Sequence, residues 1–204
     1  MNRKMIALST KHMMPVMAGA VMLVAFTGCR DTGSTPQLPR REGYVRLNPY
    51  PAEYTAAPVP VHFIVNSHAD IDTNRKDDGT YWLTATYPRY GAALYCTFTP
   101  VRDREEKIRN VENRLERMQL NIADTRIDSE ETTGPDFSAT LVTTPSASAT
   151  PVQFLIYPAA GSGWVVSGAT FFPGIKPGAS TDSVAPMIKA IEADVREAIS
   201  QFHF

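Results

Sequence analysis

Six segments of the chain alternate between apolar and polar residues in the way that predicts β-strands. In the first of them, Val59, Val61, Phe63 and Val65 fall on one face of an extended chain. The other five segments cover 81–87, 92–101, 137–143, 152–157 and 164–172. Turn-forming residues at 88–91 and 158–163 join neighbouring segments, so these pairs should form antiparallel hairpins.

A longer segment, 103–127, has the three-four spacing of an α-helix instead. Its outer face should carry ion pairs one turn apart, Asp103 with Lys107 and Glu105 with Arg109. The apolar seam is too short for a stable coiled coil, so we expect the helix to pack on a sheet. The seam consists of Ile108, Val111, Leu115, Met118 and Ile122.

The end of the chain, 183–203, predicts a second amphipathic helix, with Thr181 or Asp182 as its N-cap. Pro186 is tolerated there because the amides of the first turn have no acceptor within the helix. Strands, helix, strands and helix follow one another, and short turns connect the strands. We therefore expect one α+β domain over 43–204, with a mainly antiparallel sheet and two packed helices.

The first residues have the pattern of a secretory signal peptide. Arg3, Lys4 and Lys11 precede an apolar run at 13–26, which is short for a membrane-spanning helix. The run ends in Phe26-Thr27-Gly28-Cys29, which resembles the bacterial lipobox. We therefore expect cleavage after 1–28, lipidation of Cys29, and a polar tether at 29–42. An ordinary signal peptide followed by an incidental cysteine, or an uncleaved anchor, is the alternative.

Composition and charge limit the classes of protein to which the chain can belong. The 204 residues include 43% hydrophobic and 20% charged residues, which suits a globular domain with a core. No basic block suggests nucleic acid as a partner. Cleavage of the signal segment removes three of the 20 basic residues. The mature chain then carries 17 basic and 21 acidic residues, a formal charge of -4. Acyl chains, rather than protein charge, should hold the domain at a membrane.

The sequence contains no motif of a catalytic or metal site. GxSxG, P-loop, HExxH and CxxC patterns are absent, and we expect no cofactor. His62 and His68 lie too far apart to share a metal on an extended strand, although a turn at 66–67 would weaken this objection. The acidic residues of 70–79 are interpreted as a solvated hairpin loop. Cys96 should be a buried thiol on the same strand face as Leu94 and Phe98.

Several short stretches together resemble the family of the gliding motility lipoprotein GldD. The family shows a lipobox, a GYxR segment, a YP motif, a QF strand, an RGALYF-like strand and an xDSxxP helix start. Ser167 stands where that strand of the family has arginine, so this chain resembles a divergent member. The matching stretches are RREGYVRL at 40–47, YWL at 81–83, YP at 87–88, ALY at 93–95, TPVQF at 150–154, WVVSGATFF at 164–172, and TDS at 181–183 with Pro186.

The resemblance implies a lipoprotein that takes part in gliding and type IX protein secretion. It implies no catalytic residue. Six matched positions are candidates for function, although a turn, packing, strand or capping role is the alternative for each. They are Gly43, Tyr44, Arg46, Gln153, Asp182 and Ser183.

Two hypotheses of function follow from these patterns. In the first, the chain is a non-enzymatic accessory factor, anchored at the periplasmic face of the outer membrane, that contacts other envelope proteins. In the second, it is a periplasmic module that binds a small apolar or glycan ligand. The aromatic residues that would enclose such a ligand are Tyr81, Trp82, Tyr87, Tyr95 and Trp164, and building the core is their alternative role.

Overall fold

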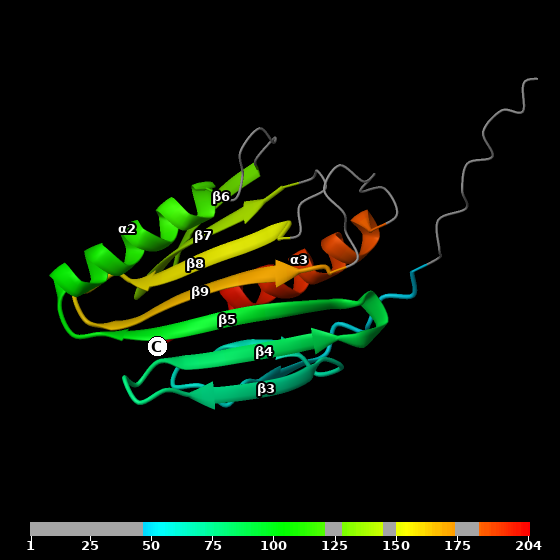
Figure 1. Cartoon of the computed structure of the whole chain (residues 1–204), viewed down its shortest axis with the longest axis horizontal. Coiled ribbons are helices and arrows are strands. Elements are labelled where there is room, and N and C mark those ends of the chain that lie inside the picture. The colour runs from blue at the N-terminus through cyan, green and yellow to red at the C-terminus, as the bar shows by residue number, and fades with distance from the viewer. Residues whose placement is uncertain (1–46, 121–127, 145–149, 174–183) are drawn as a thin grey trace, which may run out of the picture. The chain divides into compact units, whose positions relative to one another are not determined.

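A seven-stranded antiparallel sheet dominates the computed structural model, which describes residues 47–120, 128–144, 150–173 and 184–204 (Figure 1). The sheet and two helices confirm the α+β class expected from the sequence. Across the sheet the strands follow the order β3 (Asp70–Arg75), β4 (Tyr81–Tyr87), β5 (Ala92–Val101), β9 (Gly163–Phe171), β8 (Val152–Pro158), β7 (Phe137–Thr143) and β6 (Asp128–Thr133).

Both predicted hairpins are present. β4 pairs with β5 so that Leu83 lies opposite Cys96, and β8 pairs with β9 so that Gln153 lies opposite Ala169. The centre of the sheet joins segments far apart in the chain, because β5 pairs directly with β9. The alternation of side chains along each strand then gives the sheet two different faces.

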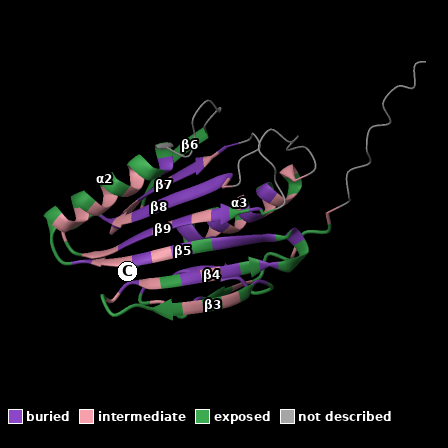
Figure 2. Cartoon of the chain, in the orientation of Figure 1, coloured by how far each residue is buried: buried purple, intermediate pink, exposed green. Residues whose placement is uncertain are grey.

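One face of the sheet carries the main hydrophobic core. It packs against helix α3 (Ala185–Ser200) and a two-stranded sheet of β1 (Tyr54–Ala56) and β2 (Ile64–Asn66). Figure 2 shows β8 buried along almost its whole length. The ring of Phe63, completely buried, lies 5.5 Å from Phe98 and 5.9 Å from Phe154, centroid to centroid. These aromatic contacts hold the β1–β2 segment on the sheet.

Helix α2 (Arg104–Leu120) lies on the opposite face, against β5, β8 and β9 (Figure 1). It covers a smaller apolar cluster of Val101, Met118, Val142, Leu155 and Val165. The predicted pair of Glu105 and Arg109 is present, with 2.9 Å between nitrogen and oxygen. The predicted pair of Asp103 and Lys107 is wrong, because the Asp103 carboxylate accepts the Glu106 amide at 2.8 Å. Lys107 turns to the sheet instead and contacts the β8–β9 turn.

Two strand predictions need correction. The segment from Val59 onward forms a strand only over Ile64–Asn66, and those residues are all buried rather than alternating. Pro58 and Pro60 precede it, and proline cannot donate to a ladder. The predicted length of the acidic hairpin loop at 70–79 was also wrong. Asp70–Arg75 forms strand β3, with Asp72 opposite Thr84, and the turn is confined to the residues around Gly79.

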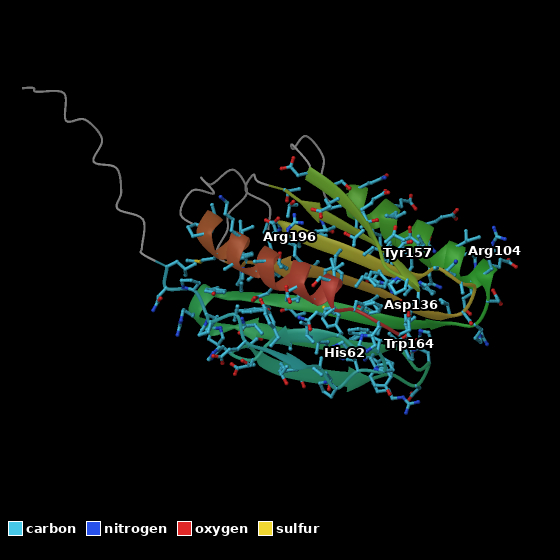
Figure 3. All side chains as sticks on the ribbon, turned by 180° about the vertical axis from the view of Figure 1, so that it is seen from behind. His62, Arg104, Asp136, Tyr157, Trp164 and Arg196 are labelled. Atoms are coloured by element: carbon cyan, nitrogen blue, oxygen red, sulfur yellow. The ribbon has the colours of Figure 1, made fainter. Side chains whose placement is uncertain are left out.

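The hydrophobic pattern did not predict strand β6, because its residues are all polar and exposed, without an apolar alternation. β6 pairs through its backbone with β7, and Glu130 contacts the guanidinium of Arg196 on α3. Figure 3 shows Arg196 on that helix, seen from behind. A polar edge strand of this kind protects a sheet from pairing with other chains.

The helix ends also differ from the predictions. Residues 121–127, including Ile122 of the predicted seam, lie outside the described residues. Helix α3 begins at Ala185, with Val184 in the N-cap position and no side-chain cap, and the predicted caps Thr181 and Asp182 are likewise not described. The helix stops at Ser200, and the backbone of His203 then forms a bridge with His62.

Candidate binding site between helix α2 and the sheet

A cavity of about 200 Å³ opens between the second half of α2 and strands β5, β8 and β9. The strand side chains Tyr95, Thr97 and Gln153 alternate with Cys96 and Phe154, which belong to the main core, so they face the other side of the sheet. The strand register puts these side chains side by side, since Thr97 lies opposite Ser167. The polar side chains of the cavity are Tyr95, Thr97, Arg114, Arg117, Gln153 and Ser167.

Arg114 reaches from α2 into this cavity. Its guanidinium donates to the Thr99 hydroxyl at 2.7 Å and to the Ser167 hydroxyl. Burial lowers the pKa of Arg114, and the positive charge of Arg117 lowers it further. Among the described residues, no carboxylate lies within ion-pair distance of either arginine. The cavity therefore holds positive charge that the described part of the chain leaves without an acidic partner.

Gln153 supplies a second polar group. It is 4% exposed on strand β8, and it lines the same cavity. Its backbone belongs to the sheet, opposite Ala169 on β9 and Val142 on β7. No described residue hydrogen-bonds to its side-chain amide, which leaves two N–H donors and a carbonyl acceptor available. The amide is not fully enclosed, because among the described residues the fully buried side-chain atom that lacks a hydrogen bond is Asp136 Oδ1. The amide of Gln153 instead lines the cavity, where it can bond to water or to a ligand.

Gln153 is the one family-motif candidate that the structure describes. The other candidates lie outside the described residues, as does Cys29, and their roles stay predictions: Gly43, Tyr44, Arg46, Asp182 and Ser183.

Sequence analysis missed Arg114, although a signal for it exists. Arg114 falls three residues after Val111 and four before Met118, within the seam that packs on the sheet. Ile108, which the seam included, is 40% exposed instead. Treating every charged residue of a helix as part of its outer face concealed both Arg114 and Lys107.

An exposed group of aromatic side chains lies beside the cavity, and we call it the aromatic face: Trp82, Tyr95 and Phe171. These residues are 49%, 50% and 38% exposed, on β4, β5 and β9. The strand register puts all three on the side of the sheet that carries the cavity and α2, since Trp82 lies opposite Thr97 and Tyr95 opposite Ala169. Figure 1 shows that α2 does not extend over β3 and β4. The ring of Tyr95 is 6.4 Å from that of Phe171, and the Lys76 ammonium lies 4.0 Å from the Trp82 ring centroid.

The five aromatic residues expected to enclose an apolar or glycan ligand do not surround one cavity. Tyr87 is buried in the main core, where burial raises its pKa well above the ordinary value. Tyr81 and Trp164 contact each other on the core side at 5.9 Å between centroids. Trp82 and Tyr95 lie on the opposite face of the sheet. Packing in the core therefore explains the positions of Tyr81, Tyr87 and Trp164.

The histidines have separate surroundings. The ring of His62 stacks on that of His203 at 4.2 Å, and Figure 3 shows His62 on the side of the sheet that faces away from α2. His68 stacks on Tyr50 at 5.5 Å and lies 3.5 Å from the Glu53 carboxylate. Within 47–120, 128–144, 150–173 and 184–204, no three His, Cys, Asp or Glu side chains form a cluster suited to a metal ion.

Cys96 is 3% exposed and shares the core face with Leu94 and Phe98, as the alternation predicted. Burial raises the pKa of its thiol far above the ordinary value, so the thiolate needed for reaction is not formed near neutral pH. None of the helices in the described ranges combines the length and apolar character that crossing a membrane requires.

Comparison with known proteins places the chain in a family. The sequence model of the family described as gliding motility lipoprotein GldD matches residues 34–204, which is most of the chain and includes every element described above. Searches of the curated proteins and of the solved structures found no match. The match confirms the family resemblance seen in the sequence motifs. The chain belongs to the family of the gliding motility lipoprotein GldD.

Proposed function

We infer that this lipoprotein is a non-enzymatic accessory factor of the gliding-motility and type IX secretion machinery, and that it acts through contacts with other envelope proteins. Signal peptidase would remove 1–28, and acyl chains on Cys29 would hold the chain at the outer membrane, facing the periplasm. Residues 29–42 would then serve as a tether for a single domain over 43–204. Membership of a family of motility lipoproteins supports the first part of this proposal.

The aromatic face carries the proposal of protein contacts. Large aromatic side chains are enriched at the centres of protein interfaces, where they bury much area at little cost in side-chain entropy. Here three of them come from three strands and are exposed together on one side of the sheet. Their hydroxyl-bearing neighbours Thr84 and Thr86 extend the surface along β4. Such a surface suits a protein partner better than it suits solvent.

Gene replacement in the source bacterium tests this function. We expect deletion of the gene to reduce the amount of type IX cargo on the cell surface, and the wild-type gene to restore it. A double variant, Trp82→Thr with Tyr95→Thr, should accumulate normally yet fail to restore the cargo. Ile108→Thr is the control, because it removes an apolar side chain, 40% exposed, from α2 rather than from the aromatic face.

Three readouts make the result decisive: surface cargo, spreading of colonies, and the cellular level of the lipoprotein. Full restoration by the double variant would show that the aromatic face is not the contact surface. Unchanged cargo and envelope integrity in the deletion strain would refute the accessory role itself. A Cys29→Ala variant in the same strain should lose membrane attachment together with function.

The second hypothesis, a ligand-binding module, retains one supporting observation, which is the cavity between α2 and the sheet. Its arginines and amide favour a charged polar group over the apolar or glycan ligand first considered. The scattering of the five aromatic residues over both faces of the sheet weighs against the original ligand class.

A further inference from the structure

We propose that the cavity between α2 and the sheet binds a carboxylate, supplied by an acidic side chain of the protein that contacts the aromatic face. This inference rests on the proposed function in one respect, namely that the carboxylate belongs to a protein partner. It assigns a chemical role to Arg114, Arg117 and Gln153, which lie together in this cavity.

The charge of the cavity is the first argument. A guanidinium removed from water is destabilised unless an opposite charge compensates it. Burial lowers the pKa of Arg114 and the charge of Arg117 lowers it further, so the charged form of Arg114 is disfavoured in the free protein. No acidic side chain of the described residues compensates them. An incoming carboxylate would relieve both the repulsion and the loss of hydration.

The hydrogen-bonding capacity of the cavity is the second argument. Arg114 has five N–H donors, and the bonds to Thr99 and Ser167 engage one on each terminal nitrogen. The Nε–H and one N–H on each terminal nitrogen remain as donors for the oxygens of a carboxylate. Gln153 adds an amide that is 4% exposed and has no hydrogen bond to a described residue. Three donor groups from two elements therefore converge on one small space.

Continuity with the aromatic face argues for a protein as the source of the carboxylate. Tyr95 belongs to both features, because it lines the cavity and is also half exposed. Trp82 lies opposite Thr97, another residue of the cavity wall. A partner that covers the aromatic rings would therefore bring its own side chains to the mouth of the cavity. Charge complementarity requires the side chain that enters to be acidic.

Binding of small probes to the full mature chain, lipidated and held in detergent, tests this proposal. The probe is glutamate capped at both ends, and capped glutamine is the control that lacks only the charge. Nitrogen-labelled glutamine allows the side-chain amide of Gln153 to be followed by NMR at constant ionic strength. We expect capped glutamate to shift this signal in a saturable way. Capped glutamine should bind about tenfold more weakly or not at all.

A pair of variants identifies the cavity. Arg117→Gln should weaken the binding of capped glutamate about tenfold, because it removes a charge at the mouth of the cavity. Arg109→Gln is the matched control, since it removes the same charge from the outer face of α2, where Arg109 pairs with Glu105. Equal effects of the two variants, equal binding of the two probes, or no saturable shift would each overturn the proposal.

Two further probes identify the source of the ligand. Tighter binding of inorganic phosphate than of capped glutamate would overturn the assignment to a carboxylate. Tighter binding of glucuronate would overturn the assignment to a protein side chain in favour of an acidic sugar. These results are independent of the gene-replacement test, which changes Trp82 and Tyr95 but neither arginine. Failure of the accessory role is therefore distinguishable from failure of the carboxylate site.

Discussion

The carboxylate of Asp194 on α3 accepts a hydrogen bond of 3.0 Å from the phenol of Tyr54 on β1. The same oxygen lies 3.3 Å from the amide nitrogen of Asn66 on β2. Burial and the neighbouring carboxylate raise the pKa of Tyr54 to about 12, so the phenol remains a donor at neutral pH. These two bonds join the C-terminal helix to the small sheet at the start of the described chain.

Replacement of this carboxylate should change the pH dependence of stability. Burial raises the pKa of Asp194, and the bonds from Tyr54 and Asn66 oppose this only in part. The folded chain therefore binds the Asp194 proton more tightly than the unfolded chain does. The resulting stabilisation is fully present below the unfolded pKa of about 3.9 and is lost as the pH rises through the folded pKa.

Asp194→Asn keeps the acceptor for both bonds and cannot ionise. We expect its free energy of unfolding to exceed that of the wild type at pH ~7, and the advantage to disappear as the pH falls below about 4. Urea unfolding followed by tryptophan fluorescence over a pH series measures this. Asp72→Asn, on the exposed edge strand β3, controls for the loss of a negative charge. A difference that is constant with pH would contradict the prediction.

Gly168 on β9 leaves room for an aromatic ring of the main core. A Cβ atom at this position would lie 2.3 Å from Cε1 of Phe154 and 3.1 Å from the Cys96 sulfur. Gly168→Ala should therefore destabilise the fold by about 1–3 kcal/mol, because the ring has to move within a packed core. Gly161→Ala is the control, since its nearest contact is an ordinary 3.4 Å. Equal unfolding midpoints for the two variants would show that the core adapts.

Lys107 should contribute more to stability than Arg109, an exposed cation of the same helix. Its ammonium lies 3.2, 3.4 and 3.0 Å from the carbonyl oxygens of Pro158, Ala159 and Ala160. Lys107→Gln should cost about 1 kcal/mol and increase hydrogen exchange in the β8–β9 turn, because three carbonyls lose a charged donor. Arg109→Gln breaks an exposed pair and should cost less than about 0.5 kcal/mol. Similar costs would mean that the carbonyl contacts add nothing.

Thiol titration tests the state of both cysteines. The buried thiol of Cys96 should not react with a disulfide reagent in the native chain, because burial raises its pKa and blocks access. In denaturant we expect one reactive thiol per mature chain, since the sulfur of Cys29 would be a thioether to the lipid. Two reactive thiols would show that Cys29 is free, and a rapid reaction before unfolding would show that Cys96 is accessible.

The amino-acid sequence by itself determined the features that depend on neighbouring residues. Apolar residues two apart predicted β4, β5, β7, β8 and β9 and placed Cys96 on the core face, because the strand period fixes which side chains share a side. Short turns predicted the hairpins, and the three-four spacing predicted both helices. The family motifs also indicated Gln153 before its surroundings were known.

Tertiary structure decided everything that depends on contacts between distant segments. β6 has no apolar pattern and exists because the backbone of β7 and the side chain of Arg196 hold it. Lys107 and Arg114 face the sheet, where carbonyl and hydroxyl groups of β5, β8 and β9 accept their hydrogen bonds. The periodicity of a helix shows only which residues share a side. Whether a cation on that side is buried depends on the acceptors of the surface it meets, and these come from strands on both sides of α2 in the sequence.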